Sequence, residues 1–231
     1  MLYGLLLLLL GAALAGFAGL LGGLAWALVW PALSFALVGF AYVAARPAAL
    51  GKRPDGSIAG LPKIVLAPFL LLTLGVWHLL RLGGEVAAHR VAPGLWVGRR
   101  PRAGEVPEGV AWVVDLTAEL PAAAEIRRLP GYLCVPVLDG TAPAPAVLRA
   151  LVDQLRGREN ILLHCASGHG RSATVAAALL LERGLARDVV DAESQLRRAR
   201  PRIRLNAAQR RAVEAMALGT GSSWEAAAIA E

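Results

Sequence analysis

The sequence predicts an α/β domain with a central, mainly parallel sheet flanked by helices, preceded by an α-helical transmembrane region. Two observations predict this fold class. The first 45 residues carry no charged side chain, although the chain has 24 basic and 17 acidic residues. From about residue 84 onward, short apolar runs alternate with amphipathic segments, which is typical of strands alternating with helices. The chain therefore has a membrane part and a soluble part.

The uncharged N-terminal stretch is too long for one membrane span. As a straight helix its 45 residues would measure roughly 68 Å, about twice the ~30 Å hydrocarbon core of a bilayer. We therefore expect two spans, residues 2–21 and 24–45, joined by a turn at Gly22 and Gly23. A cleaved signal peptide is the alternative, but it requires a basic start and a shorter apolar core.

A third apolar run, residues 64–80, lies between Lys63 and Arg81 and is expected to form a third span. A buried helix of the soluble domain is the alternative. The expected organisation is a membrane anchor over residues 1–83, a soluble domain over 84–218 and a C-terminal tail over 219–231. Three spans would place the loop 46–63 and the soluble domain on opposite faces of the membrane, with basic residues almost equally divided between them.

The soluble part has the size and pattern of one α/β domain, with about 140 residues available for a single core. Runs rich in β-branched and aromatic residues predict strands at residues 94–98, 110–116, 132–137 and 160–164. Amphipathic or Ala-rich segments predict helices at residues 121–128, 145–155, 171–183, 186–198 and 206–218.

Composition excludes several classes of protein. A hydrophobic content of 56% excludes a disordered chain, and two cysteines exclude a disulfide framework. The net charge of +7 brings no nucleic-acid motif or aromatic platform with it, so no nucleic-acid partner is expected. Seven arginines between Arg197 and Arg211 form either a patch for anionic lipid headgroups or an Arg-rich exposed surface.

The segment from His164 to Ser172 carries the chemistry. It follows an apolar strand and opens an Ala/Leu-rich helix, so its backbone N–H groups and the helix N-terminus favour an anion. Glycines 168 and 170 permit the tight backbone that such a cradle needs. Arg171 adds a fork that matches two phosphate oxygens, and Cys165 faces the same point, where positive potential favours the nucleophilic thiolate.

This segment, HCASGHGRS, is a Cys-x5-Arg signature, and the chain resembles the dual-specificity branch of the protein tyrosine phosphatase superfamily. The resemblance runs from about Val91 to Val213 and includes GLWVG, VAWVVDLTAE, YLCVPVLDG and RPRIRLNAAQ. It extends to membrane-anchored bacterial members that act on lipid phosphates. The resemblance implies a dual-specificity-phosphatase-like fold and no cofactor or metal.

The resemblance also implies roles for individual residues. Asp139, 26 residues before Cys165, matches the general acid, although an Asp-Gly pair is also simply a favoured turn. Ser172 would hydrogen-bond the sulfur and help it leave, and His164 would orient the thiolate without transferring a proton. The phosphate-binding loop would comprise Ala166, Ser167, Gly168, His169, Gly170 and Arg171.

Four further side chains allow two interpretations each. His169 either contacts the substrate headgroup or is solvated. Asp115 and Glu119 either lie near the cleft or are solvated carboxylates of a turn. Cys134 is expected to be a buried small hydrophobe, and a disulfide with Cys165 is the less favoured alternative.

Together these observations predict an integral, multi-pass membrane protein that hydrolyses phosphomonoesters through a phosphocysteine intermediate, with membrane lipids as its surroundings. A catalytic thiolate requires a reducing compartment, so the domain is expected to face the cytoplasm. Given three spans, the loop 46–63 and the N-terminus are then expected outside. Two substrate classes stay open: phospholipid headgroups, such as phosphatidylglycerol phosphate or a phosphoinositide, and phosphotyrosine or phosphothreonine proteins. An inactive phosphate-binding membrane module and a transporter with a regulatory domain are the rival classes.

Overall fold

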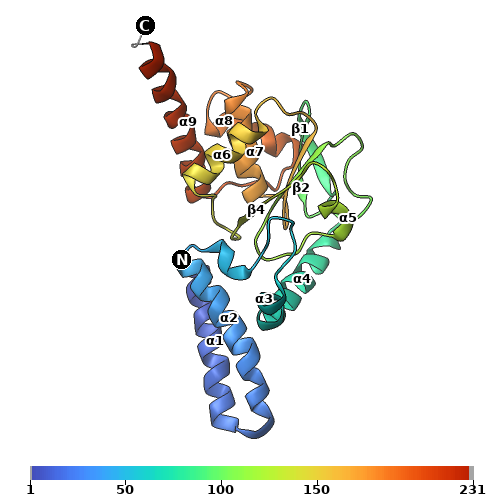
Figure 1. Ribbon diagram of the computed structural model, residues 1–231, viewed down its shortest axis with the longest axis vertical. Coiled ribbons are helices and arrows are strands. Elements are labelled where there is room, and N and C mark those ends of the chain that lie inside the picture. Colours follow the sequence, from blue (N-terminus) through green and yellow to red (C-terminus); the bar gives the residue numbers. More distant parts are fainter. Residues whose placement is uncertain (1, 229–231) are drawn as a thin grey trace. The chain divides into compact units, whose positions relative to one another are not determined.

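The computed structural model describes residues 2–228, with side chains for residues 2–218 (Figure 1). The chain divides into two compact units. The N-terminal unit takes in the chain up to Glu85 together with Thr117–Ala122 and Cys134–Leu138. The C-terminal unit holds Val86–Leu116, Ala123–Leu133 and the chain from Asp139 onward.

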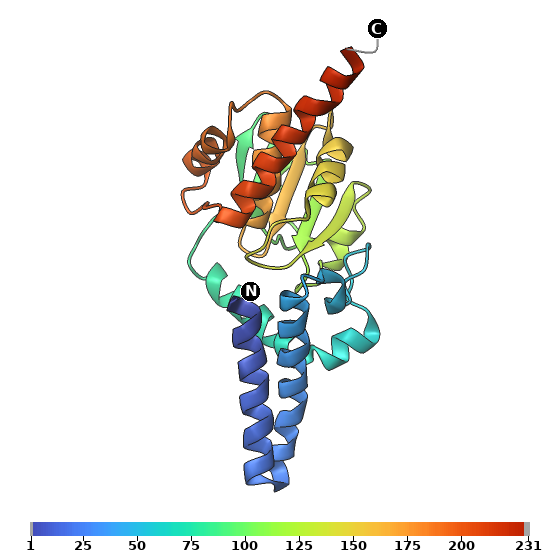
Figure 2. The same cartoon turned by 90° about the vertical axis from the view of Figure 1, so that its left-hand side faces the viewer.

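The N-terminal unit begins with a helical hairpin, whose two arms lie side by side in Figures 1 and 2. Gly22 and Gly23 form the turn with φ of 62° and 53°, which glycine adopts without steric cost. Its first arm, and the second arm taken as Gly23–Val43, are each long and apolar enough to cross a membrane. The helices of the hairpin are α1 (Leu2–Leu21), η1 (Gly23–Leu28) and α2 (Val29–Val43).

The expected third span over residues 64–80 is not a single helix. A short η2 (Pro47–Leu50) is followed by α3 (Gly60–Val65) and α4 (Ala67–Arg81), and the helix is broken at Leu66. Pro68 lies in the first turn of α4, where its missing N–H is tolerated. At 15 residues, α4 measures about 22 Å, which is shorter than the ~30 Å hydrocarbon core.

The loop before α3 is hydrogen-bonded to the turn that follows β3 in the chain. The Lys52 ammonium donates hydrogen bonds to Thr117 and Leu120, and the Ala122 N–H donates to the carbonyl of Gly56 at 2.9 Å. Thr117 is the last residue of a strand in the domain's sheet. Among the described residues, two helices are long and apolar enough to cross a membrane and α4 is a shorter apolar helix, so the third span stays a prediction.

The chain from Val86 onward forms a five-stranded sheet, in the order β1-β2-β5-β3-β4, in which most of β4 is assigned to the N-terminal unit. The pairs β2–β5 and β3–β5 are parallel, and β1–β2 is antiparallel, which confirms the predicted α/β class with a mainly parallel centre. β1 was not predicted, because it is a half-exposed edge strand without an apolar run. The strands are β1 (Ala88–Ala92), β2 (Leu95–Arg99), β3 (Trp112–Thr117), β4 (Tyr132–Val137) and β5 (Ile161–Cys165).

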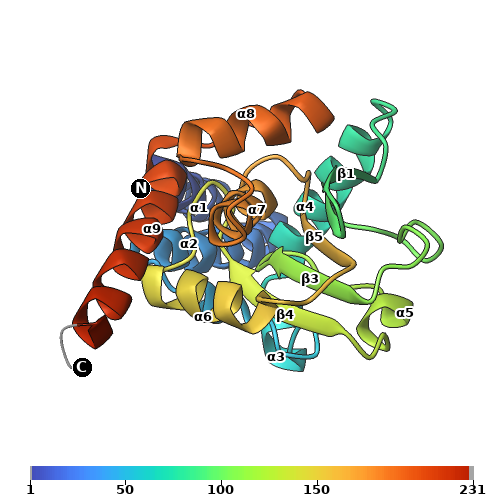
Figure 3. The ribbon, with the colours of Figure 1, turned by 90° about the horizontal axis from the view of Figure 1, so that it is seen from above.

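Helices cover both faces of this sheet, with α7 packed on β5 and β2 and with α6, α8 and α9 around it (Figure 3). The first ten residues of α7 are buried, and its many alanines allow this close packing. On the other face, Ile126 of α5 packs with Val113 and Leu162. The helices are α5 (Ala124–Arg127), α6 (Pro145–Leu155), α7 (Arg171–Glu182), α8 (Val189–Ala199) and α9 (Ala207–Ala228).

The expected tail, residues 219–231, is in part a continuation of α9. The backbone of α9 runs without interruption to Ala228. Residues 229–231, and the side chains from residue 219 onward, lie outside the described residues.

Candidate active site

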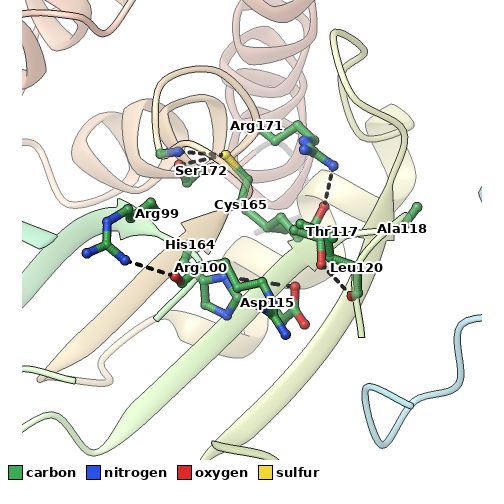
Figure 4. Close-up of polar contacts among 12 residues, drawn as sticks. Arg99, Arg100, Asp115, Thr117, Ala118, Leu120, His164, Cys165, Arg171 and Ser172 are labelled. Carbon is green, nitrogen blue, oxygen red and sulfur yellow. Dashed lines mark hydrogen bonds and ion pairs between the residues drawn. The ribbon is translucent and has the colours of Figure 1, made fainter. Parts of the chain in front are cut away.

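The Cys-x5-Arg loop lies between the central strand β5 and helix α7, as the sequence predicts (Figure 4). All five residues of β5 are buried, and β5 is paired on both sides by parallel strands. Cys165 is its last residue, and Arg171 is the first residue of α7. The sheet and the helix thus fix both ends of the loop.

The carbonyl groups of the loop are engaged by donors outside it, at distances of 2.9 to 3.4 Å. Because a trans peptide points its N–H opposite to its C=O, the amides that follow these carbonyls turn toward the centre of the loop. The N–H of Gly168 accordingly donates to the Cys165 sulfur at 3.2 Å. This geometry makes the loop an anion cradle. The four pairs are Ala166 O with Arg100 N, Ser167 O with Arg200 Nη2, His169 O with Arg204 N and Gly170 O with Thr174 Oγ1.

Gly168 meets two separate requirements. Its φ is +81°, in the left-handed region that side chains disfavour. A Cβ at this position would also collide with the backbone of Gly98 and would lie 2.7 Å from the N atom of Arg99. Gly170, by contrast, has φ of −116° and does not use glycine's special freedom. Only one of the two loop glycines is therefore required by its backbone angle.

The side chains predicted to carry the chemistry are brought together. Cys165 is 2% exposed, and its sulfur lies 3.4 Å from the hydroxyl of Ser172. Arg171 is 1% exposed, and its Nη2 lies 2.9 Å from the carboxylate of Asp139. The Nη1 of Arg171 donates to the carbonyl of Leu116 at 3.4 Å. The Asp139 side chain itself is 59% exposed, so the carboxylate reaches Arg171 from the solvent side.

A buried polar chain lies behind the cysteine. His164 is 1% exposed, and its Nδ1 lies 3.9 Å from the carboxylate of Asp115. The hydroxyl of Tyr132 donates to the other carboxylate oxygen of Asp115 at 2.9 Å. Asp115 is fully buried, so its interpretation as a solvated turn residue was wrong. Buried carboxylates need such partners, and the Tyr132 hydroxyl supplies one to Asp115.

Two further expectations are changed by the structure. Glu119 is also buried, at 4% exposed, and accepts a hydrogen bond from the N–H of Ala118 at 3.0 Å. Cys134 is half-buried rather than buried, and Cys134 and Cys165 are both free thiols. His169 is half-buried on the loop, and its carbonyl is one of the four described above.

Arg200 supports the loop but was not singled out among the seven arginines of its segment. It is fully buried and donates to the carbonyls of Val86 at 3.1 Å and Ser167 at 2.9 Å. Its Nη1 also lies 3.0 Å from the Nδ1 of His89. Nothing in the sequence distinguishes this arginine from its exposed neighbours, because its inward direction is set by contacts with residues far along the chain.

Comparisons with known proteins agree with this geometry. A family model described as "PTP-SAK: Swiss Army Knife protein, DSP-PTPase phosphatase domain" matches residues 101–218, about half of the chain. "Putative tyrosine phosphatase 067L" of Invertebrate iridescent virus 3 is 37% identical over 82 residues, which cover 31% of this chain and 34% of that protein. The match thus spans about a third of the relative's length.

Solved structures share the fold. The crystal structure of Tk-PTP in the active form is 28% identical with a TM-score of 0.50, over 57% of this chain and 97% of that one. The crystal structure of PTPMT1 in complex with PI(5)P has the same TM-score at 19% identity, over 59% and 97% of the two chains. At that identity the second likeness shows the fold alone.

Proposed function

Since the chain belongs to the family of DSP-PTPase phosphatases of the Swiss Army Knife type, and so is a cysteine-dependent phosphatase, we propose that it hydrolyses phosphomonoesters of membrane lipids through a phosphocysteine intermediate. The observation that carries the proposed chemistry is the Cys165 sulfur, held 3.2 Å from an inward-pointing amide and 3.4 Å from a hydroxyl. Both groups stabilise a thiolate.

The first half-reaction uses the cradle, the nucleophile and the acid. The loop amides and Arg171 hold the phosphate, and the Cys165 sulfur attacks phosphorus as the ester P–O bond breaks. Asp139 donates a proton to the leaving alkoxide, which departs as the alcohol. The present pairing of Asp139 with Arg171, at 2.9 Å, supports this role. A phosphate dianion competes with the carboxylate for the guanidinium and leaves Asp139 beside the leaving oxygen.

The second half-reaction releases the enzyme. Asp139, now ionised, accepts a proton from a water that attacks phosphorus, and the P–S bond breaks to give inorganic phosphate. Ser172 donates a hydrogen bond to the departing sulfur, and this role is supported by the 3.4 Å separation of its hydroxyl from the sulfur. His164 orients the loop from below through Asp115 and Tyr132. No metal or cofactor takes part in this scheme.

The proposed anchor is the hairpin of α1 and Gly23–Val43. Because the segment after α2 contacts Thr117 and Leu120, its basic residues, Arg46, Lys52, Arg53 and Lys63, belong on the same side as the phosphatase domain. The turn at the other end of the hairpin carries no charge. This asymmetry favours a cytoplasmic domain by the positive-inside rule, with the N-terminus also in the cytoplasm.

Helices α3 and α4 are proposed to lie along the membrane surface rather than across it. Both expose large apolar side chains, and the Arg81 guanidinium lies 4.8 Å from the Trp77 ring centroid at the end of α4. Apolar side chains with flanking bases and an aromatic ring are typical of an interfacial helix. The exposed apolar side chains include Leu61, Ile64, Leu71, Leu72, Leu79 and Leu80.

This orientation is testable with single cysteines and an impermeant maleimide. We expect Ser57→Cys to be protected in intact cells and labelled after lysis, because Ser57 lies in the segment after α2. Leu24→Cys, at the 97% exposed start of the second arm, should be labelled in intact cells. The opposite result at the two positions would place the domain outside.

A lipid substrate follows from the anchoring. Only the six residues 82–87 separate α4 from β1, and such a short link would keep the site close to the bilayer surface. A fold of this kind holds PI(5)P in the PTPMT1 crystal structure. The viral relative, named as a tyrosine phosphatase, supports phosphotyrosine proteins as the second candidate substrate.

The experiment that tests the function is hydrolysis by the full-length protein reconstituted in vesicles. Vesicles carrying phosphatidylglycerol phosphate or phosphoinositides are compared with soluble phosphotyrosine and phosphothreonine peptides, and Cys165→Ser serves as the inactive control. We expect phosphate release from a lipid with kcat/KM at least about tenfold above that for any peptide. Preference for a peptide would replace the lipid proposal with the protein one, and no release from any substrate would overturn both.

A further inference from the structure

Lys52 lies between α2 and α3, outside the region that matches the phosphatase family. Its ammonium group nevertheless binds the Thr117–Leu120 turn, which lies inside that region. The residue is 8% exposed. Its Nζ donates to the Thr117 carbonyl at 2.7 Å, the Thr117 hydroxyl at 2.6 Å and the Leu120 carbonyl at 2.7 Å. Short hydrogen bonds from a charged donor are the strong kind, and burial raises the cost of losing them.

The same turn is also held by apolar burial. Ala118 from the turn and Leu138 from the end of β4 belong to a buried cluster with Leu50, Leu66 and Phe69 of the N-terminal unit. Residues 46–69 therefore provide both the charge that holds the Thr117–Leu120 turn and the apolar surface that covers it. Without them, the turn would expose apolar side chains and leave buried carbonyl oxygens short of donors.

The held segments continue directly into the site. Leu116, immediately before the turn, is the residue whose carbonyl accepts from Arg171 Nη1. Asp139, the partner of Arg171 Nη2, immediately follows Leu138. Both groups that orient the Arg171 guanidinium thus lie one residue along the chain from the segments fixed by the N-terminal unit.

We propose that Lys52 is a positioning residue of the phosphatase site, which sets the Leu116 carbonyl, and with it the Arg171 fork, by holding the Thr117–Leu120 turn. This inference rests on the proposed role of Arg171 in binding phosphate. Loss of the ammonium lets the turn and the Leu116 carbonyl shift, so the fork no longer matches two phosphate oxygens. The effect is expected on phosphate binding rather than on proton transfer.

The test compares full-length Lys52→Met with Lys63→Met, an exposed lysine of α3 that contacts no part of the site. KM and kcat are measured with p-nitrophenyl phosphate and with an alkyl phosphate. Binding of inorganic phosphate is measured by calorimetry in a Cys165→Ser background. We expect Lys52→Met to raise KM and the phosphate Kd about five- to tenfold, the effect of one misplaced charge-assisted hydrogen bond. The ratio of kcat between the two substrates should stay constant, and Lys63→Met should behave as wild type.

A second variant covers the case in which Lys52→Met does not fold. Thr117→Val removes one of the three acceptors with little change in side-chain shape, and should raise KM and Kd about two- to threefold. Wild-type KM and Kd in folded Lys52→Met would overturn the inference. If Lys52→Met does not fold, wild-type values in folded Thr117→Val would overturn it. A wild type that binds phosphate but hydrolyses nothing would overturn the proposed function, and the calorimetric comparison would still decide the role of Lys52.

Discussion

The phosphate loop and the segment that carries Asp139 are held in different ways. Four donors outside the phosphate loop bind its carbonyls, and one of them is the fully buried Arg200. Asp139 is 59% exposed, and Gly140 beside it has φ of 70°. The backbone there is held by amide side chains at the start of α9, through Asn206 to the Gly140 carbonyl and Gln209 to the Thr141 carbonyl. The comparison indicates a buried nucleophile and cradle, with a carboxylate that reaches Arg171 from the solvent side.

The largest loss of activity is expected from a change in the phosphate loop. Cys165→Ser should lower kcat by at least about 10³-fold, because a hydroxyl does not replace the thiolate as nucleophile. Phosphate affinity should be nearly unchanged, since the amides and Arg171 remain. Turnover with p-nitrophenyl phosphate and calorimetric phosphate binding measure the two quantities. Substantial activity in the variant would remove Cys165 from the mechanism.

The exposed carboxylate of Asp139 should show dependence on the leaving group. Asp139→Asn is expected to lower kcat for an alkyl phosphate by about 10²-fold or more, because the alkoxide needs a proton to leave. With p-nitrophenyl phosphate, whose leaving group is stable without protonation, the loss should be less than about tenfold. Equal losses on both substrates would mean that Asp139 acts only through Arg171.

Arg200 tests whether the preset loop depends on its support. Arg200→Met removes the donors to the Val86 and Ser167 carbonyls from a fully buried site. We expect the free energy of unfolding to fall by about 2 to 4 kcal/mol, and kcat/KM of the folded fraction to fall about tenfold. Arg202→Met, an exposed neighbour, is the control. An unchanged kcat/KM in folded Arg200→Met would show that the loop keeps its shape without this support.

The smallest effect is expected on stability, at Glu193, which lies outside the phosphate loop and the Asp139 segment. Burial opposes ionisation of Glu193, but hydrogen bonds from Arg210 and from the N–H of Leu205 outweigh it and hold the pKa below the ordinary 4.5. A lowered carboxyl pKa contributes stability above its ordinary value, and this contribution is lost as the pH falls through the lowered pKa. Glu193→Gln should therefore cost about 1 kcal/mol at neutral pH and progressively less in acid, with kcat unchanged.

Thermal melts of Glu193→Gln between neutral pH and pH 3 measure this change. Glu108→Gln, an exposed carboxylate of the segment between β2 and β3, is the control and should leave the pH dependence of stability as in the wild type. If the loss of unfolding free energy in Glu193→Gln stayed the same throughout the acid range, packing rather than the charge of Glu193 would stabilise this region.

The parts of the site whose residues are consecutive in the chain could be predicted from the sequence. The strand, loop and helix around Cys165 were predicted because the whole cradle is encoded in nine consecutive residues. Asp139 was reached only through a family resemblance, since an Asp-Gly turn carries no signal of its own. The inward direction of Arg200 and the burial of Asp115 were missed because their partners lie far along the chain.

The membrane region shows the same limit. Hydropathy predicted helices at residues 2–21 and 24–45, and α1 and the Gly23–Val43 arm lie there. It also predicted a third span, because apolar composition does not distinguish a crossing helix from one that exposes Leu71 and Leu79 along a surface. The contact between Lys52 and Thr117, 65 residues apart, supports the proposed surface position of α4, and it has no sequence signature.

The contact between Gly98 and Gly168 restricts how this enzyme can evolve. A Cβ at Gly98 would meet the backbone of residue 87 and would lie 2.9 Å from the Ala88 Cβ, and one at Gly168 would meet Gly98. Three backbones thus stack without an intervening side chain, and no single substitution at either glycine leaves the stack intact. A side chain at either glycine would therefore require the backbone of residues 87–88 or 98–99 to shift.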